Sequence, residues 1–220
     1  MQNNSQRIDY LRRYIRMEKT IILSSHYFPS IAYFEILVNN QSIVIDYGEH
    51  YLKQSYRNRC LIYTSNGSLA LSVPVIRKNK TLVKDVLLEL NSNWKKTHWK
   101  AISSAYNSSP FFEFYEHDLK TVFFKEHQTL QELNNELLKH ICSEIGIITT
   151  INTSMVYINI DETNLDYRNL IDAKKSYVQA DSYPRYIQTF EEKHGFIRNL
   201  SILDLLFHEG PETLNYMKAL

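Results

Sequence analysis

The sequence predicts an α+β fold, in which a mixed or antiparallel sheet from the N-terminal half is covered by helices from the C-terminal half. Three observations lead to this fold class. Apolar runs of strand length dominate up to residue 90, segments with helical periodicity dominate residues 94–146, and Asn66-Gly67 lies between two apolar runs as a hairpin signal. At 220 residues, 44% of them hydrophobic, the chain can bury a substantial core.

The N-terminal half carries most of the predicted strands. TIILSS indicates a buried strand that ends before a turn at Phe28-Pro29, the segment 31–38 has helical spacing, and QSIVIDY indicates a second strand. CLIYTS and LALSVPVI are the two arms of the predicted hairpin, and Pro74 places the second arm at a sheet edge or near its own end. KDVLLEL completes the strands of this half.

The C-terminal half carries the predicted helices. WKKTHWKAISSAY, PFFEFYEHDLKTVFFKEH and TLQELNNELLKHICSEIG have helical periodicity, and Gly146 is the expected C-cap of the third. ITTINTSMVYI indicates one more strand, and NLSILDLLFH indicates a helix stopped by Gly210-Pro211. No internal repeat or low-complexity linker divides the chain, so residues 19–220 are expected to form one domain.

Residues 1–18 differ in character from the rest of the chain. Arginine recurs through a weakly amphipathic segment, which suits a short helix or a frayed arm. We expect this stretch to be an extension, with translation starting at Met17. A nucleic-acid or membrane role of the arm is the alternative.

Composition and charge exclude several classes of function. Lysine plus arginine number 25 against 24 acids, so the net charge of +1 gives no global field for nucleic acid or an anionic membrane. No apolar run approaches the roughly 20 residues of a membrane span. The two cysteines, without a leader-like N-terminus, favour a reduced, cytoplasmic protein.

Cofactor and metal motifs are not found in the sequence. The five glycines are scattered and form neither a P-loop nor a dinucleotide fingerprint. His117, His127 and His140 do not combine with the cysteines into a zinc signature. We therefore predict no metal and no cofactor. Cys60 is a candidate thiolate nucleophile or a small apolar strand residue, whereas Cys142 is expected in the core.

The stretch HYLKQSYRNRC concentrates side chains that suit an anionic ligand. If it leads into the strand CLIY, alternation places Arg57 and Arg59 on one face, where two guanidiniums can clamp a phosphate or carboxylate. The alternative is that both arginines pair with acids such as Asp46 and Glu49. The candidate ligand-binding residues of this stretch are His50, Lys53, Ser55, Arg57, Asn58 and Arg59.

The segment WKKTHWKAISSAY supplies the candidate catalytic residues. On a helix, His98 and Tyr106 share a face, and a histidine near its ordinary pKa of about 6.5 is a natural acid or base at neutral pH. Tyr106 would orient a hydroxyl group, and Trp94 joins the candidate ligand-binding residues. The alternative is a core-facing His98 with a satisfied hydrogen bond.

Five stretches together resemble the WbqC-like family of bacterial proteins, most closely its Bacteroidetes form. They are SSHYFPSIAYF, HYLKQSYRNRCLIYTSNGSLALSVPV, WKKTHWKAISSAYNSSPFFEFY, LQELNNELLKHICSEIGI and YIQTFEEKHGFIRNLSILDLLFHEGPE. The resemblance covers Thr20 to the C-terminus. His26 stands where other branches have a glutamine-like or small polar residue, and Arg198 stands where proline is expected.

The resemblance implies a role in bacterial surface-polysaccharide biosynthesis of the O-antigen type. The expected reaction is transfer of an acyl or aminoacyl group to a sugar by a transferase. Its Arg/Lys loop would hold a nucleotide-sugar or acyl donor, and His98 would move a proton. The alternative is a non-catalytic module that binds a nucleotide-sugar, a glycan intermediate or a biosynthetic partner protein. An enzyme should bring His98 and the loop into one pocket.

Overall fold

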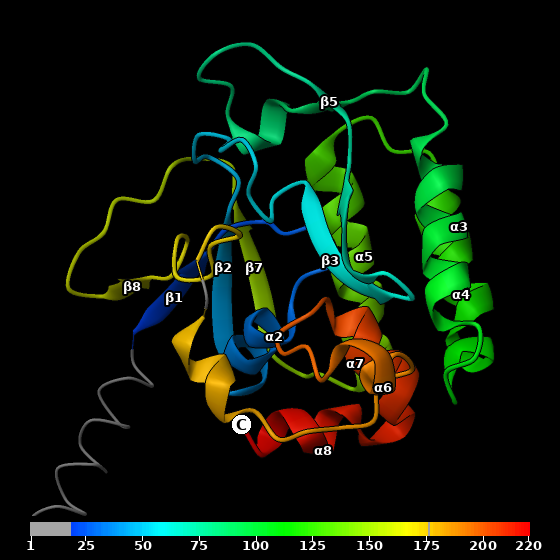
Figure 1. The fold of residues 1–220 in the computed structure, drawn as a ribbon. Helices are drawn as coiled ribbons and strands as arrows, with labels where there is room; N and C mark the ends of the chain where they lie inside the picture. The colour runs from blue at the N-terminus through cyan, green and yellow to red at the C-terminus, as the bar shows by residue number, and fades with distance from the viewer. Residues whose placement is uncertain (1–18, 176) are drawn as a thin grey trace, which may run out of the picture.

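A parallel sheet lies at the centre of the computed structural model, which describes residues 19–175 and 177–220 (Figure 1). Its strands are β1 (Thr20–Leu23), β2 (Ser42–Asp46), β7 (Thr150–Ser154) and β8 (Asn164–Asp166), in the order β7-β2-β1-β8. Because β2 and β7 extend the sheet on one side of β1 and β8 on the other, the strand order reverses between β1 and β8.

Two antiparallel pairs accompany this sheet. The predicted hairpin is confirmed: β3 (Arg59–Thr64) pairs with β4 (Gly67–Ser72) around Asn66-Gly67. The short strands β5 (Val75–Ile76) and β6 (Leu87–Leu88) form the other pair.

The four described α-helices before residue 146 follow the sequence periodicity closely. They are α2 (Ile31–Val38), α3 (Trp94–Tyr106), α4 (Phe112–Phe124) and α5 (Leu130–Ile145). Helix α5 begins with a reciprocal capping box between Thr129 and Glu132 and ends at Gly146, whose φ of 79° is left-handed. The predicted C-cap is therefore confirmed.

The remaining helical elements are short. They are η1 (Val83–Asp85), η2 (Val178–Ser182), α6 (Glu191–His194), α7 (Ile202–Glu209), η3 (Gly210–Glu212) and α8 (Thr213–Lys218). The predicted stop after α7 is confirmed at Gly210, where a Cβ atom would lie only 2.5 Å from the ring of Phe111. The prediction of KDVLLEL as one strand is wrong, because its first two residues belong to η1 and only Leu87 and Leu88 pair as a strand.

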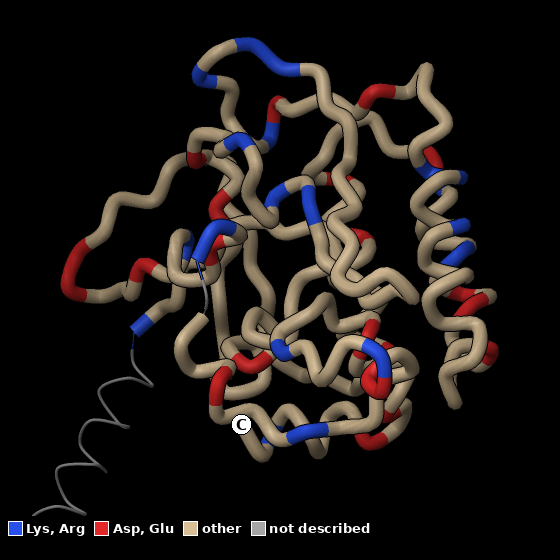
Figure 2. Tube along the Cα trace, in the orientation of Figure 1, with Lys and Arg blue, Asp and Glu red and all other residues tan. Residues whose placement is uncertain are grey.

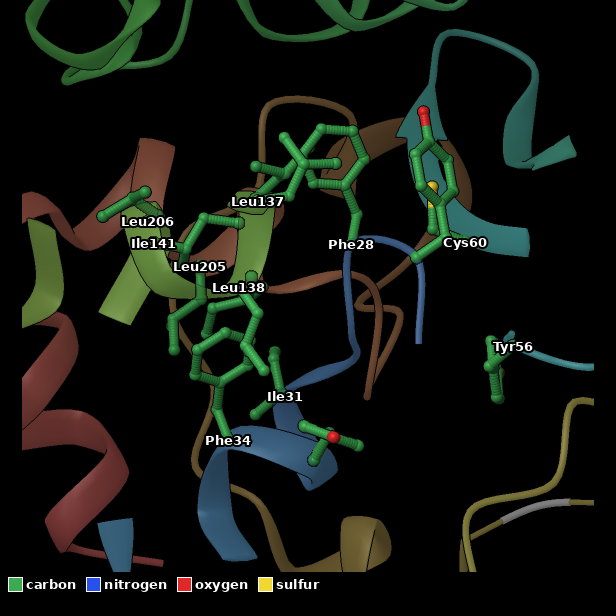
Figure 3. Close-up of a cluster of buried hydrophobic side chains, with 14 of the residues drawn as sticks. Phe28, Ile31, Phe34, Tyr56, Cys60, Leu137, Leu138, Ile141, Leu205 and Leu206 are labelled. Atoms are coloured by element: carbon green, nitrogen blue, oxygen red, sulfur yellow. The ribbon is translucent and has the colours of Figure 1, made fainter. Parts of the chain in front are cut away.

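The core joins segments that are far apart in sequence. Figure 3 shows Phe28 and Phe34 from the β1–α2 region beside Leu137 and Leu138 of α5 and Leu205 of α7. All five side chains are buried. Packing of this kind ties the first strand and its loop to the helices of the C-terminal half.

The α+β class is confirmed, with parallel and antiparallel strands concentrated in the N-terminal half. The parallel sheet, however, also recruits β7 and β8 from the C-terminal half. β8 escaped prediction because it has three residues and no alternating pattern. The expectations for residues 1–18 lie outside the described part of the chain. Within that part, no helix combines the length and apolar character needed to cross a membrane.

Candidate functional site

Buried polar side chains gather where the parallel strands end. We call them the carboxyl-edge cluster. The segments after β1, β2 and β8 supply most of them, and α5 and the loop before β3 supply the others. The cluster consists of Ser24, Ser25, His26, Asp46, Glu49, Arg57, Asn134 and Arg168, all at most 6% exposed. Open parallel sheets bind their ligands outside the carboxyl ends of the strands, near the point where strand order reverses. The cluster occupies that position.

Two arginines of the cluster are neutralised by carboxylates. Arg168 donates from Nη1 to Asp46 Oδ2 at 2.7 Å and makes a two-fold contact with Asp166, from Nε at 2.9 Å and from Nη2 at 2.8 Å. These hydrogen bonds hold the pKa of Asp166 below its usual value. Arg57 makes a similar contact with Glu49. Three carboxylates thus face two guanidiniums, so the cluster itself has no surplus positive charge.

The hydrogen bonds of His26 define which of its ring nitrogens carries the proton. Ser24 Oγ donates to the carbonyl oxygen of Arg168 at 2.7 Å, which uses the only proton of the hydroxyl group. His26 Nε2, 3.3 Å from Ser24 Oγ, must therefore donate to that oxygen. Nδ1 is left as a buried acceptor with no partner among the described residues.

Burial keeps the His26 ring neutral. Desolvation, aided by the charge of Arg57, lowers its pKa well below the ordinary value of 6.5. The ring also packs against Tyr33 and Tyr56 in tilted arrangements, with centroid distances of 4.8 and 5.6 Å. His26 is thus a fixed, uncharged imidazole with a free lone pair.

Asn134 presents a second acceptor of this kind. Its Nδ2 donates to Ser25 Oγ at 3.0 Å and to the carbonyl oxygen of Arg57 at 2.8 Å, which fixes the amide. Its Oδ1 is buried and has no partner in the described part of the chain. A buried polar atom without a partner indicates a place for water or a ligand. Two such acceptors suit a ligand that donates hydrogen bonds, such as a hydroxyl or amine.

Two loops of the cluster, the one after β1 and the one before β3, each contain a residue with a strained backbone conformation. Phe28, two residues after His26, has a φ of 40°, and Gln54 in the loop before β3 has a φ of 56°. Left-handed conformations are unfavourable for residues with a side chain and often mark functional segments. The surrounding contacts hold both loops in place, including the hydrogen bond from Tyr27 N–H to the carbonyl of Tyr56.

The predicted anion-binding loop lies beside the cluster, but its arginines do not act as a pair. Arg57 is buried against Glu49, as the alternative interpretation predicted, whereas Arg59 begins β3 and donates from Nε to Ser72 Oγ at 3.1 Å. The Glu49 carboxylate occupies the fork of Arg57, so the structure does not show the predicted clamp of two guanidiniums. A contribution of either arginine to ligand binding remains a prediction.

The other predicted loop residues have mostly local contacts. His50 Nδ1 lies 3.1 Å from the carbonyl oxygen of Lys80, Ser55 donates to the carbonyl of Leu52, and Asn58 donates to that of Val73. Lys53 is exposed and has no carboxylate partner among residues 19–175 and 177–220. It remains available to an anionic ligand.

His98 differs from the expectation of an ordinary pKa. Its Nδ1 lies 2.9 Å from the hydroxyl of Tyr27, and it also bonds to the backbone of Ser72. Burial lowers its pKa to about 4. The ring packs against Trp94, itself buried, at a centroid distance of 5.2 Å. The alternative interpretation of a satisfied core histidine describes these contacts, and a role of His98 in proton transfer stays a prediction.

Tyr106 belongs to a separate buried network. Its hydroxyl oxygen accepts from the backbone N–H of Tyr63 at 3.1 Å, and its pKa is raised well above the ordinary value by burial and by the neighbouring Asp204. Asp204 also accepts from Tyr186 and Gln188. This network joins α3, β3 and α7, which indicates a structural contribution of Tyr106.

The cysteines are buried and free. Burial raises the pKa of Cys60 far above the ordinary value and that of Cys142 to about 12. These surroundings fit the interpretation of Cys60 as a small apolar strand residue better than its interpretation as a nucleophile. In the described part of the chain, no three His, Cys, Asp or Glu side chains converge in a group that could hold a metal ion.

His26 did not stand out in the sequence as a candidate for chemistry. Its signal was its position directly after the buried strand TIIL. That signal becomes informative only when the strand is known to belong to a parallel sheet, whose carboxyl edge is the usual ligand side.

Sequence comparison relates the chain to a protein family and to a protein of another organism. The sequence profile of the WbqC-like protein family matches residues 24–176 and 171–216, ranges that include the whole carboxyl-edge cluster. A protein of Mycobacterium tuberculosis (strain ATCC 25618 / H37Rv), named Uncharacterized protein Rv1507c, is 30% identical over 228 residues, covering 92% of this chain and 98% of that protein. No solved structure matches the chain.

Proposed function

The chain belongs to the WbqC-like protein family, and on this premise we propose that it is a transferase of bacterial surface-polysaccharide biosynthesis that works at the carboxyl-edge cluster. The proposed reaction moves an acyl or aminoacyl group from an activated donor to a hydroxyl group of a sugar. We assign the proton transfer to His26 instead of His98.

One observation carries this assignment: the buried Nδ1 of His26, a fixed acceptor without a partner among the described residues. A sugar hydroxyl that donates to Nδ1 would lose its proton to the ring as its oxygen attacks the acyl carbon. The bond to the donor's leaving group breaks, and the leaving group departs with the electron pair. The imidazolium then returns the proton to the leaving group.

The lowered pKa of His26 fits a base that is strengthened by its substrate. Desolvation and the charge of Arg57 keep the free ring neutral, which is the form that accepts a proton. A bound anionic donor would offset the charge of Arg57 and raise the pKa of the ring. Proton transfer would thus depend on the donor being in place.

The donor's negative charge requires cations outside the cluster, because carboxylates already pair with Arg57 and Arg168. Lys53 is exposed in the loop beside the cluster, and Arg59 follows at the start of β3. These two side chains would attract the anionic donor, which is the role that the residue types of the loop predict.

The reaction can be tested by incubating the purified protein with a panel of acyl phosphates and acyl thioesters as donors and with free sugars and nucleotide-sugars as acceptors, read by mass spectrometry. We expect an acylated sugar with at least one donor and no such product with the His26→Gln variant. A product formed equally well by that variant would refute the assignment.

A non-catalytic binding module is the second candidate function. It is favoured by the lowered pKa values of both His26 and His98, which leave neither histidine titrating near neutral pH in the free protein. In that case, calorimetry would detect a bound nucleotide-sugar or glycan intermediate, and mass spectrometry would detect no turnover of it.

A further inference from the structure

A pocket of about 460 Å³ opens at the carboxyl ends of β2 and β7, beside the carboxyl-edge cluster. Its volume falls in the range of small-molecule sites. Most of its wall is apolar, and the rim carries two basic side chains. The lining residues are Gly48, His50, Leu82, Lys84, Met155, Val156 and Tyr157.

The walls of this pocket are held in place by close backbone contacts. A Cβ atom on Gly48 would lie 2.1 Å from the backbone nitrogen of Tyr157, so the two loops approach as closely as they do because residue 48 is glycine. Lys84 Nζ donates to the carbonyl oxygen of Met155 at 3.0 Å and links the two sides of the pocket.

Tyr157 gives the pocket a fixed flat surface. The guanidinium carbon of Arg168 lies 4.5 Å from the centroid of its ring, and Arg168 is itself anchored by Asp46 and Asp166. The Tyr157 side chain nevertheless remains 50% exposed, and its neighbour Val156 is 74% exposed. An exposed aromatic ring held at a pocket wall is suited to stacking with a planar group.

Basic residues are frequent in the two segments that contribute His50, Leu82 and Lys84 to the pocket wall. The segments 50–60 and 77–84 contain no acid, and they are joined by hydrogen bonds from Tyr51 N–H to the carbonyl of Thr81 and from Val83 N–H to that of Glu49. Figure 2 shows a run of basic positions on the loop at the top of the molecule, above the sheet. Apart from Arg57, which Glu49 neutralises, the basic residues of the two segments are Lys53, Arg59, Arg77, Lys78, Lys80 and Lys84.

We propose that this pocket and its basic rim bind the nucleoside diphosphate part of a phosphorylated substrate. The base would stack in the apolar pocket on Tyr157, and the diphosphate would lie over the lysines of the rim. A coenzyme A thioester carries such a group on the acyl donor, and a nucleotide-sugar carries it on the acceptor, so the site would bind either source. This inference rests on the proposed function, because it assigns the chemical class of a substrate for that reaction.

The pocket also predicts weak discrimination among bases. Its lining is mainly apolar, so stacking would contribute more than hydrogen bonds to the edge of the base. Stacking tolerates every base, because each one has a π face. Dissociation constants for UDP, CDP, GDP and ADP should therefore agree within about threefold.

The inference can be tested by titration calorimetry of the full chain with these four nucleotides and with inorganic pyrophosphate. Tyr157→Leu, which removes the ring but keeps an apolar side chain, should weaken nucleotide binding about 5- to 100-fold and leave pyrophosphate binding unchanged. Lys78→Gln/Lys80→Gln should weaken both. The matched controls are Phe114→Leu on α4 and Lys96→Gln/Lys100→Gln on α3, all exposed positions, which should change neither.

Several outcomes would overturn the inference. They are the absence of saturable nucleotide binding, pyrophosphate binding as tight as that of ADP, and unchanged nucleotide binding by Tyr157→Leu. Sedimentation with phosphatidylglycerol vesicles, without nucleotide binding, would instead identify the rim as a membrane-contacting surface.

The two proposals fail separately. Transfer from acyl phosphates that depends on His26, without nucleotide binding, would overturn the nucleotide site alone. Nucleotide binding that depends on Tyr157, without transfer from any donor, would overturn the proposed reaction alone.

Discussion

Arg57 and Glu49 form a buried pair with two parallel hydrogen bonds, Nε to Oε1 at 2.8 Å and Nη2 to Oε2 at 2.6 Å. Only 3% and 7% of the two side chains are exposed. Burial raises the pKa of Glu49 even though Arg57 opposes the shift. The carboxylate therefore depends on the guanidinium for its charge compensation.

We expect the Arg57→Leu variant to lose about 3–5 kcal/mol of unfolding free energy, because it leaves the Glu49 carboxylate buried without a partner. Urea denaturation would measure the loss. Arg59→Leu, at a partly exposed position, should cost under about 1 kcal/mol. The double variant Arg57→Leu/Glu49→Leu should recover much of the loss. Equal stability of Arg57→Leu and the wild type would show that the pair does not support the fold.

Acid should destabilise the protein through His98. Its pKa is about 4 in the folded protein against an ordinary 6.5, so between these values the unfolded chain binds a proton that the folded chain does not. Stability is therefore lost as pH falls from about 6.5 towards 4, by about 3 kcal/mol in total. His26 acts in the same direction.

Unfolding free energies measured by urea denaturation from pH 7.5 to 4.5 would test this effect of His98. In the window between the two pKa values, the wild type should lose up to about 1.4 kcal/mol more per pH unit than His98→Gln. Parallel pH profiles of the two proteins would be incompatible with a neutral, buried His98.

Neither thiol should react in the native protein. Cys60 and Cys142 are 1% and 6% exposed, and burial raises the pKa of both, so little thiolate forms at neutral pH. Titration with a coloured disulfide reagent should detect no fast-reacting group before denaturant is added and two afterwards. Rapid labelling of Cys60 in the folded protein would restore the nucleophile interpretation.

Local signals explain which parts of the fold were predictable. The hairpin at Asn66-Gly67 and the cap at Gly146 depend on neighbouring residues, so the sequence specifies them directly. The parallel pairing of β1 with β8 joins residues more than 140 positions apart, and no local pattern reports such a contact. The largest sheet was therefore not predicted as parallel.

The same limit applies to the candidate site. The loop from His50 to Cys60 stood out because its residue types are unusual, and the structure places it beside the carboxyl-edge cluster. The sequence spacing suggested Glu49 as a partner of Arg57, but it did not distinguish this pair from a ligand-binding role of Arg57. The importance of His26 depends on Ser24, Arg168 and the strand order together, so it became apparent only in the folded chain.

In the proposed reaction, His26 and not His98 accepts the proton during transfer. His26→Gln and His98→Gln provide a matched pair, because both histidines are 5% exposed and both substitutions retain an amide of similar length. The direct measurement is the rate of acyl-sugar formation by each folded variant, at pH 7.5, with the donor that the panel identifies. We predict no detectable product with His26→Gln and a rate near that of the wild type with His98→Gln. Full activity of His26→Gln, or loss of activity confined to His98→Gln, would contradict the claim.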